Sequence, residues 1–122
     1  IFVTSGLSQM INPFWGPYAA SKAALEVLLK TYAAEMEKTP LRVNLVDPGV
    51  MATDLFKKAM PGADLTQIPS PEEMTDVFMY LASEACQETG QIFKARDFKT
   101  KAEKPKKSTP KAKPKPRLKK AL

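Results

Sequence analysis

Short apolar runs and two amphipathic segments alternate along most of this sequence. Residues 1–5, 41–46 and 91–95 are largely apolar and have the length of buried strands. Residues 18–38 carry apolar side chains at helical spacing and end at Lys38-Thr39-Pro40, which favours a helix between the first two strands. This order predicts a βαβ unit, whose crossover is right-handed and whose two strands are parallel.

A second helix is predicted to begin at Ser70-Pro71-Glu72-Glu73, where serine can cap the helix, proline suits its first turn and glutamate can complete a capping box. The apolar stripe that follows consists of Met74, Val77, Phe78, Leu81, Ala82 and Ala85. Residues 91–95 would then lie beside 41–46 as the last strand of the sheet. Between the two helices, residues 55–69 mix apolar side chains with Pro and Gly, which is typical of a mobile flap.

Tyr18 and Lys22 lie four residues apart in the first predicted helix, so the phenol and the ammonium project from the same face. Helical spacing places Leu25, Leu29, Tyr32, Ala33 and Met36 on this inward face, and Glu26, Lys30, Glu37 and Lys38 elsewhere. Lysine is rarely buried without a partner, and an ammonium near a phenol stabilises the phenolate, so the pair is suited to proton transfer. The alternative is an ordinary amphipathic helix, in which the tyrosine packs and the lysine reaches solvent.

Polar residues follow the first two predicted strands. Ser5 ends the first strand and Asp47-Pro48-Gly49 follows the second. Because the strands are parallel, we expect both to emerge at the same edge of the sheet, where open α/β sheets bind ligands. Thr53 or Asp54 can cap a short helix at 55–60, and Thr53 keeps its side chain for another role if Asp54 makes the cap.

The composition excludes several classes of protein. The 122 residues, 43% of them hydrophobic, are enough for one domain with a modest core. Cys86 is the single cysteine and there is no histidine, which excludes an internal disulfide, a His-dependent catalytic triad and a histidine-bound zinc site. No apolar run reaches the roughly 18 residues that span a bilayer, and no signal sequence opens the chain, so we expect a cytoplasmic protein with no membrane span.

The composition changes abruptly at Lys99. Residues 99–122 contain eleven Lys or Arg and one Glu, net +10, whereas residues 1–98 contain eight basic and twelve acidic residues, net −4; together these give +6. With four prolines and no aromatic residue, this Lys/Pro-rich basic tail is predicted to be disordered, because it has too little apolar surface to offset the entropy of ordering. It can make weak, nonspecific contact with nucleic acid through phosphates, or it can serve only as a solubilising tail.

Three motifs in residues 1–98 together resemble the C-terminal half of the short-chain dehydrogenase/reductase family. They are Ile1-Phe2-Val3-Thr4-Ser5-Gly6, Tyr18-x-x-x-Lys22 at the start of a helix, and Asp47-Pro48-Gly49-Val50-Met51-Ala52-Thr53-Asp54-Leu55 after the second strand. The resemblance implies an α/β fold: the C-terminal half of a Rossmann-type doubly wound parallel sheet, with three parallel strands, two main helices and a substrate flap. None of the five glycines can form the family's dinucleotide fingerprint, and an apolar strand opens the chain at Ile1, so we expect a truncated chain that lacks the N-terminal dinucleotide-binding half.

The same resemblance implies roles for individual residues. In the catalytic set, Ser5 would hydrogen-bond the substrate oxygen, Tyr18 would exchange a proton with it, and Lys22 would tune Tyr18 and hold the nicotinamide ribose. The cofactor-binding residues would be Tyr18, Lys22, Pro48, Gly49, Val50, Met51 and Thr53. Arg96-Asp97-Phe98 departs from the family, which usually has glycines after this last strand.

The function implied is that of an oxidoreductase that transfers a hydride between a nicotinamide cofactor, NAD or NADP, and a carbonyl or alcohol substrate, in a full-length parent of which this chain alone would be inactive. Family analogy also implies a homo-oligomer that pairs through the Tyr18 helix. The competing hypothesis is a non-catalytic Rossmann-like binding protein, whose basic tail contacts nucleic acid or acidic partners. The presence of Ser5, Tyr18 and Lys22 favours the enzyme.

Overall fold

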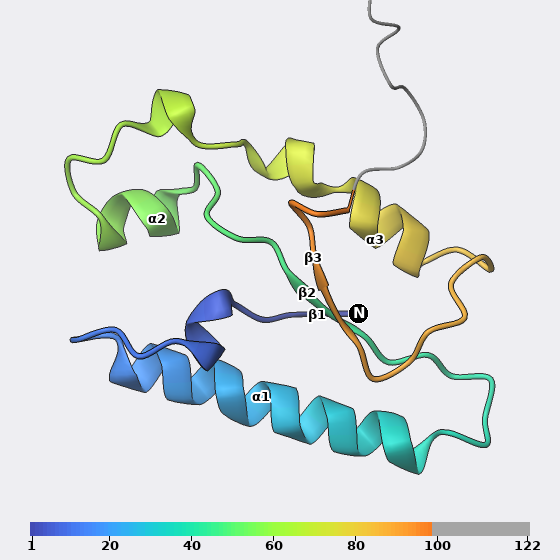
Figure 1. The fold of residues 1–122 in the computed structure, drawn as a ribbon. Helices are drawn as coiled ribbons and strands as arrows, with labels where there is room; N and C mark the ends of the chain where they lie inside the picture. Colours follow the sequence, from blue (N-terminus) through green and yellow to red (C-terminus); the bar gives the residue numbers. More distant parts are fainter. Residues whose placement is uncertain (99–122) are drawn as a thin grey trace, which may run out of the picture.

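The computed structural model describes residues 1–98, so the prediction for the basic tail at 99–122 lies outside the described residues. Within this part, β1 (Phe2–Val3), β2 (Leu45–Asp47) and β3 (Ile92–Lys94) form a parallel sheet in the order β1-β2-β3 (Figure 1). Phe2 pairs with Leu45, and Leu45 pairs with Ile92 on its other side. The predicted parallel βαβ unit and the position of the last strand are confirmed.

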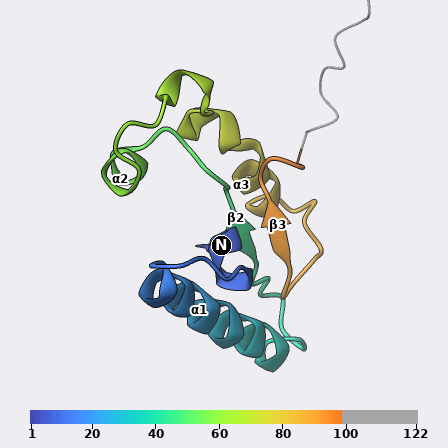
Figure 2. The same ribbon diagram turned by 60° about the vertical axis from the view of Figure 1, so that its left-hand side comes forward.

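Helices cover both faces of this sheet. The long helix α1 (Gly16–Glu35) lies along one face, and the short helix α3 (Asp76–Leu81) lies on the other, as two views of the ribbon show (Figures 1 and 2). Successive residues of a strand point to opposite faces. Leu45 accordingly belongs to the core under α1, and its neighbour Val46 belongs to the core under α3.

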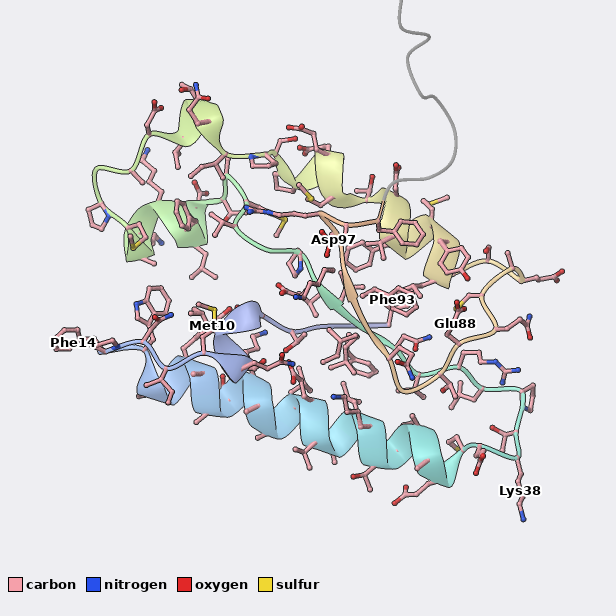
Figure 3. The ribbon with its side chains drawn as sticks, viewed as in Figure 1. Met10, Phe14, Lys38, Glu88, Phe93 and Asp97 are labelled. Carbon is pink, nitrogen blue, oxygen red and sulfur yellow. The ribbon has the colours of Figure 1, made fainter. Side chains whose placement is uncertain are left out.

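The two cores are small and apolar. The core under α1 contains Leu29, Ala33, Val43 and Leu45, with Leu25 and Ile92 packed against it. The core under α3 contains Val46, Met74, Val77, Leu81, Cys86 and Ala95, with Met51, Phe78, Tyr80, Phe93 and Phe98 packed against it. Figure 3 shows Phe93 on the side of the sheet that faces α3. Each core buries only some of the side chains that were predicted to face inward from its helix, and the others are half-buried or exposed.

The inward face of α1 was predicted only in part. Leu29 and Ala33 are buried, but Tyr32 is 39% exposed, because it lies about 100° around the helix from Ala33. Glu26, predicted to lie off the inward face, is 7% exposed and is one of the buried polar residues. The helix also begins earlier and ends earlier than predicted, at Gly16 and Glu35, with Pro17 in its first turn.

The predicted helix from Ser70 divides into two short elements. The capping box between Ser70 and Glu73 is present, but it opens a 3-10 turn, η3 (Pro71–Met74), which is followed by α3. The α-helix ends at Leu81, where the Ser83 hydroxyl donates to the Tyr80 carbonyl oxygen at 2.7 Å. Ala82 and Ala85 are therefore exposed rather than part of the apolar stripe, whereas Cys86 is buried.

The second strand is shifted along the chain from its predicted position at 41–46. Residues 43 and 44 precede the strand but are still buried, and the Phe2 amide donates to the Asn44 carbonyl oxygen at 3.0 Å. The Asn44 side chain is satisfied by two further bonds, donated to the Glu88 carbonyl oxygen at 2.7 Å and accepted from the Gln91 amide at 3.1 Å. A buried amide side chain with these partners joins the strand to the turn before β3.

The predicted flap at 55–69 contains two short elements, α2 (Asp54–Ala59) and the 3-10 turn η2 (Leu65–Gln67). Leu55 is 69% exposed and Met60 is 47% exposed, so much of the apolar surface of this segment faces outward. In Figures 1 and 2, α2 lies at the same end of the molecule as the start of α1. In the part of the chain that the structure describes, no helix is long and apolar enough to cross a membrane.

Candidate functional site

The carboxyl ends of the three parallel strands meet at one edge of the sheet. The Thr4 amide donates to the Val46 carbonyl oxygen at 2.8 Å, so Ser5 and Asp47 emerge side by side, as predicted. A cavity of about 500 Å³ opens there, and its lining includes Ser5, Gly49 and Arg96 from the ends of the three strands. Met10 and Asp97, labelled in Figure 3, also line it.

Ser5 caps a 3-10 turn at the end of β1. Its hydroxyl oxygen accepts a hydrogen bond from the Leu7 amide at 3.3 Å, and this starts η1 (Gly6–Gln9). A serine hydroxyl has one donor proton and two lone pairs, so this bond leaves the O–H group able to donate elsewhere. The cap therefore fixes the Ser5 side chain at the cavity without using its proton.

Tyr18 and Lys22 lie one turn apart near the start of α1, and both are half-buried. The Lys22 ammonium nitrogen is 5.9 Å from the centre of the Tyr18 ring and donates to the Val3 carbonyl oxygen at 3.1 Å. The ring of Trp15 packs edge-on against the Tyr18 ring, with centroids 5.8 Å apart. Lys22 thus holds the end of β1, two residues before Ser5, while its charge stays beside Tyr18.

The structure brings these three side chains to one region but does not link them all directly. Among residues 1–98, no hydrogen bond joins the hydroxyl groups of Ser5 and Tyr18. Tyr18 and Lys22 also lie outside the lining of the cavity, which extends from Ser5 toward the end of β3. The cavity therefore extends beside Tyr18 and Lys22 rather than around them.

The segment from Pro48 to Thr53 leaves β2 and is held at several points. The Gly49 amide donates to the Asp47 carboxylate at 3.0 Å, and the Ala52 amide donates to the Pro69 carbonyl oxygen at 2.8 Å. Gly49 has a φ of +71°, a conformation that favours glycine. Pro48 is buried, Val50 is exposed, and the Met51 side chain packs against the core under α3. Of residues 48–53, only Gly49 lines the cavity.

Thr53 makes the cap of α2 itself. Its hydroxyl oxygen accepts from the Phe56 amide at 3.2 Å, whereas Asp54 is already the first residue of the helix. Of the two capping residues that the sequence allowed, the helix therefore uses Thr53 and not Asp54, because the extended residue before the first turn is Thr53 (φ −119°, ψ 160°). As with Ser5, the capping bond uses a lone pair and leaves the hydroxyl proton of Thr53 able to donate.

Two residues at this edge were not predicted to belong to the site. Arg96 donates from Nη2 to the Val50 carbonyl oxygen at 3.0 Å, and its side chain lies across Gly49. Glu26 accepts hydrogen bonds from Thr4 and Ser8, each at 2.5 Å, and from Gln9 at 3.4 Å. The sequence did contain a signal for Glu26, because it lies four residues after Lys22 and eight after Tyr18, on the same helical face.

Electrostatics at this edge centre on the buried Glu26 carboxyl group. Burial acts to raise its pKa, but the hydrogen bonds from Ser8, Thr4 and Gln9, together with the positive charge of Lys30, outweigh burial and hold the pKa of Glu26 below its ordinary value. The group is therefore ionised at neutral pH. Within residues 1–98, the structure contains no group of three or more Cys, Asp or Glu side chains that could hold a metal ion.

Comparison with known proteins gives the family. The short chain dehydrogenase family profile matches residues 1–64, half of the chain. The chain is 32% identical over 94 residues to NADPH-dependent aldehyde reductase 2, chloroplastic, from Arabidopsis thaliana, covering 70% of this chain and 35% of that protein. This chain belongs to the short-chain dehydrogenase/reductase family, as its motifs predicted.

Solved structures agree with this assignment. A short chain dehydrogenase from Salmonella enterica serovar Typhi CT18 aligns with a TM-score of 0.74 at 28% identity, covering 77% of this chain and 39% of that one. A protein from Escherichia coli CFT073, solved in complex with NADPH, aligns with a TM-score of 0.73 at 30% identity, covering 78% of this chain and 40% of that one. The described residues thus have the fold of part of a Rossmann-type domain, and the chain spans less than half the length of these relatives.

Proposed function

We propose that the whole protein to which this chain belongs is an NAD(P)-dependent oxidoreductase that interconverts a carbonyl compound and an alcohol. The observation that carries the proposal is the arrangement of Tyr18 and Lys22 on α1, with the Lys22 ammonium 5.9 Å from the Tyr18 ring and bound to β1 two residues before Ser5. A phenol beside a fixed cation can exchange a proton with a substrate oxygen, because the cation stabilises the phenolate. When bound, the nicotinamide supplies or accepts the hydride.

In this proposal the three side chains have separate tasks. Tyr18 donates the proton to the substrate oxygen in reduction and accepts it in oxidation. Ser5 donates its hydroxyl proton to the same oxygen, which its cap leaves possible because the bond from Leu7 uses only a lone pair. Lys22 has three donors, of which one is bound to Val3, so it can stabilise the phenolate and still bind a ribose hydroxyl.

The residues that would hold the nicotinamide fit a polar amide and a ribose. Tyr18 and Lys22 would face the ribose, and the backbone of Pro48, Gly49, Val50 and Met51 would lie against the nicotinamide ring. The Thr53 hydroxyl has its proton left to donate to the carboxamide oxygen. The carboxyl edge of parallel strands is where open α/β sheets bind dinucleotides, and the E. coli CFT073 structure contains NADPH. The cofactor of this protein is therefore proposed to be NAD or NADP.

The test is turnover of aldehydes and ketones by the whole protein with NADH and with NADPH, followed through nicotinamide absorbance. Tyr18→Phe should lower kcat by about 10²- to 10⁴-fold, the usual contribution of general acid–base catalysis, and should leave the nicotinamide Kd nearly unchanged. Lys22→Ala should lower kcat and weaken nicotinamide binding as well. Tyr32→Phe is the matched control, because Tyr32 lies on the same helix and is 39% exposed.

A Tyr18→Phe variant that turns over as fast as Tyr32→Phe would contradict the proposed proton transfer. A wild-type protein with no activity on any carbonyl, but with tight binding to acidic partners, would favour the non-catalytic binding protein instead. That second candidate rests on the net charge of +10 at 99–122, and any nucleic-acid contact made there should weaken steeply with added salt.

We also propose that the protein forms a homo-oligomer through α1. Val27 and Leu28 are 67% and 64% exposed on this helix, so its outer face is apolar enough to pack against a second copy.

The outer edge of β1 has no neighbouring strand among the described residues, and Phe2 and Val3 are 43% and 44% exposed. An unpaired apolar edge favours aggregation, so residues 1–122 expressed alone should be neither stable nor active.

A further inference from the structure

The strongest feature at the site that the proposed function leaves unused is the buried carboxylate of Glu26. Three donors from one short segment converge on it: the hydroxyl groups of Thr4 and Ser8 on Oε1 and the Gln9 amide on Oε2. Thr4 is 2% exposed and Glu26 is 7% exposed. Hydrogen bonds to an ionised, buried acceptor are stronger than those between neutral groups, so this is a firm junction between α1 and the segment that follows β1.

The segment held by Glu26 is the one that carries Ser5. Thr4 precedes Ser5 directly, and Ser8 and Gln9 belong to the turn η1 that Ser5 caps. On the helix side, Glu26 lies one turn after Lys22, which binds the Val3 carbonyl oxygen at 3.1 Å. Helix α1 therefore holds the segment on both sides of Ser5, at Val3 through Lys22 and at Thr4, Ser8 and Gln9 through Glu26.

From this arrangement we infer that Glu26 is a positioning residue that sets the distance between the Ser5 hydroxyl and the Tyr18 hydroxyl. The inference rests on the proposed function, in which both groups bind one substrate oxygen. No hydrogen bond joins Ser5 and Tyr18, and Ser5 lies thirteen positions before Tyr18 in the chain, so their spacing depends on contacts between η1 and α1. Without Glu26, the Thr4 hydroxyl would be buried without this acceptor, and the turn would be free to shift.

A purely structural role for Glu26 predicts something different. In that case its loss would lower the stability of the whole domain, and hydrogen exchange would rise in β2 as much as in η1. A positioning role predicts a local effect: faster exchange at the Leu7 and Ser8 amides, which bond to Ser5 at 3.3 and 2.9 Å, and slower chemistry with unchanged cofactor binding. A displacement of about 1 Å can cost about 10²-fold in rate.

The test compares Glu26→Ala, Glu26→Gln and Glu35→Ala in the whole protein. Glu35 ends the same helix and is exposed, so it is the matched control. Glu26→Ala should speed exchange at the Leu7 and Ser8 amides at least tenfold, leave the β2 amides within about twofold, and lower kcat by about 10- to 100-fold with the nicotinamide Kd within about twofold. Glu26→Gln should recover most of kcat, because its amide oxygen can still accept from both hydroxyls.

Equal acceleration of exchange in η1 and β2, or a kcat for Glu26→Ala that matches Glu35→Ala, would overturn the inference. If Glu26→Ala does not fold, the double variant Thr4→Val with Ser8→Ala removes the same bonds from the other side, and the same local effect is expected. If the wild-type protein reduces no carbonyl, the proposed function fails, and exchange at Leu7 and Ser8 still decides whether Glu26 holds the segment around Ser5.

Discussion

The Arg96 side chain lies across Gly49, so even a methyl group at position 49 should destabilise the fold. Gly49 has a φ of +71°, and a Cβ placed there would lie 2.8 Å from Arg96 Nε and 3.3 Å from its Cδ and Cζ. Gly49→Ala should therefore have two costs: about 1–2 kcal/mol for an L-residue in the left-handed region, and the displacement of Arg96 from the Val50 carbonyl oxygen. A hydrogen bond of this kind contributes about 0.5–1.5 kcal/mol.

Part of this cost is offset because alanine restricts the unfolded chain, by about 0.4–1 kcal/mol. We expect Gly49→Ala in the whole protein to lower the free energy of unfolding by about 0.5–3 kcal/mol, measured by urea denaturation followed by circular dichroism. In an Arg96→Ala background there is no side chain to displace, so the same substitution should cost about 0.5–1.5 kcal/mol less. The backbone and unfolded-state contributions are the same in both backgrounds and cancel in this comparison.

The double-mutant cycle of Gly49→Ala and Arg96→Ala measures the coupling energy between the two positions. Equal costs of Gly49→Ala in the two backgrounds, within about 0.3 kcal/mol, would show that Arg96 does not lie across Gly49. A cost near zero in both would show that the loop does not need the left-handed conformation. Because this loop is proposed to hold the nicotinamide, Gly49→Ala should also weaken cofactor binding, which the same samples can report by fluorescence titration.

Two further predictions concern the stability of the whole protein. Leu81→Ala should lower the free energy of unfolding by about 2–5 kcal/mol, because this side chain is 7% exposed in the core under α3. Met79→Ala on the same helix, where the side chain is 72% exposed, should change it by no more than about 0.5 kcal/mol. Thermal and urea unfolding of both variants check this, and similar costs for the two would be inconsistent with the described core. The pKa of Glu26 is lowered in the folded state, so its contribution to stability is present above the ordinary pKa of about 4.5 and is lost as the pH falls through the lowered value. Glu26→Gln, which does not titrate, should therefore lose less stability on acidification. If the free energies of unfolding in urea of wild type and Glu26→Gln fall equally at acid pH, the assigned pKa shift is contradicted.

Much of the architecture could be predicted because it depends on periodicity and on local signals. The strand, helix and strand order follows from short apolar runs on either side of a helical pattern, and the parallel sheet follows from the βαβ connection. The capping box at Ser70 and Glu73 is local in sequence and was predicted correctly. What periodicity could not give was where each element ends. Thr75 separates η3 from α3, and its hydroxyl donates to the Glu72 carbonyl oxygen at 2.8 Å.

The site residues that were missed have partners far away in the sequence. Glu26 is buried because hydroxyl groups 18 and 22 residues earlier supply its hydrogen bonds, and a helical pattern scored on apolar residues assigns a carboxylate to the outer side. Arg96 contacts a loop 46 residues earlier. In contrast, the proximity of Tyr18 and Lys22 could be predicted, because they lie one helical turn apart on the same helix.

Tyr18 is proposed to exchange a proton with a substrate whose carbon receives a hydride from nicotinamide. The most direct measurement is transfer of deuterium from NADH or NADPH labelled at the transferable position of the ring, with the product carbon analysed by mass spectrometry. Wild type and Tyr32→Phe should place deuterium on the carbinol carbon of the product. Tyr18→Phe should do so at a rate at least about 10²-fold lower, with an unchanged nicotinamide Kd. Product without deuterium, or equal transfer rates in the two phenylalanine variants, would contradict it.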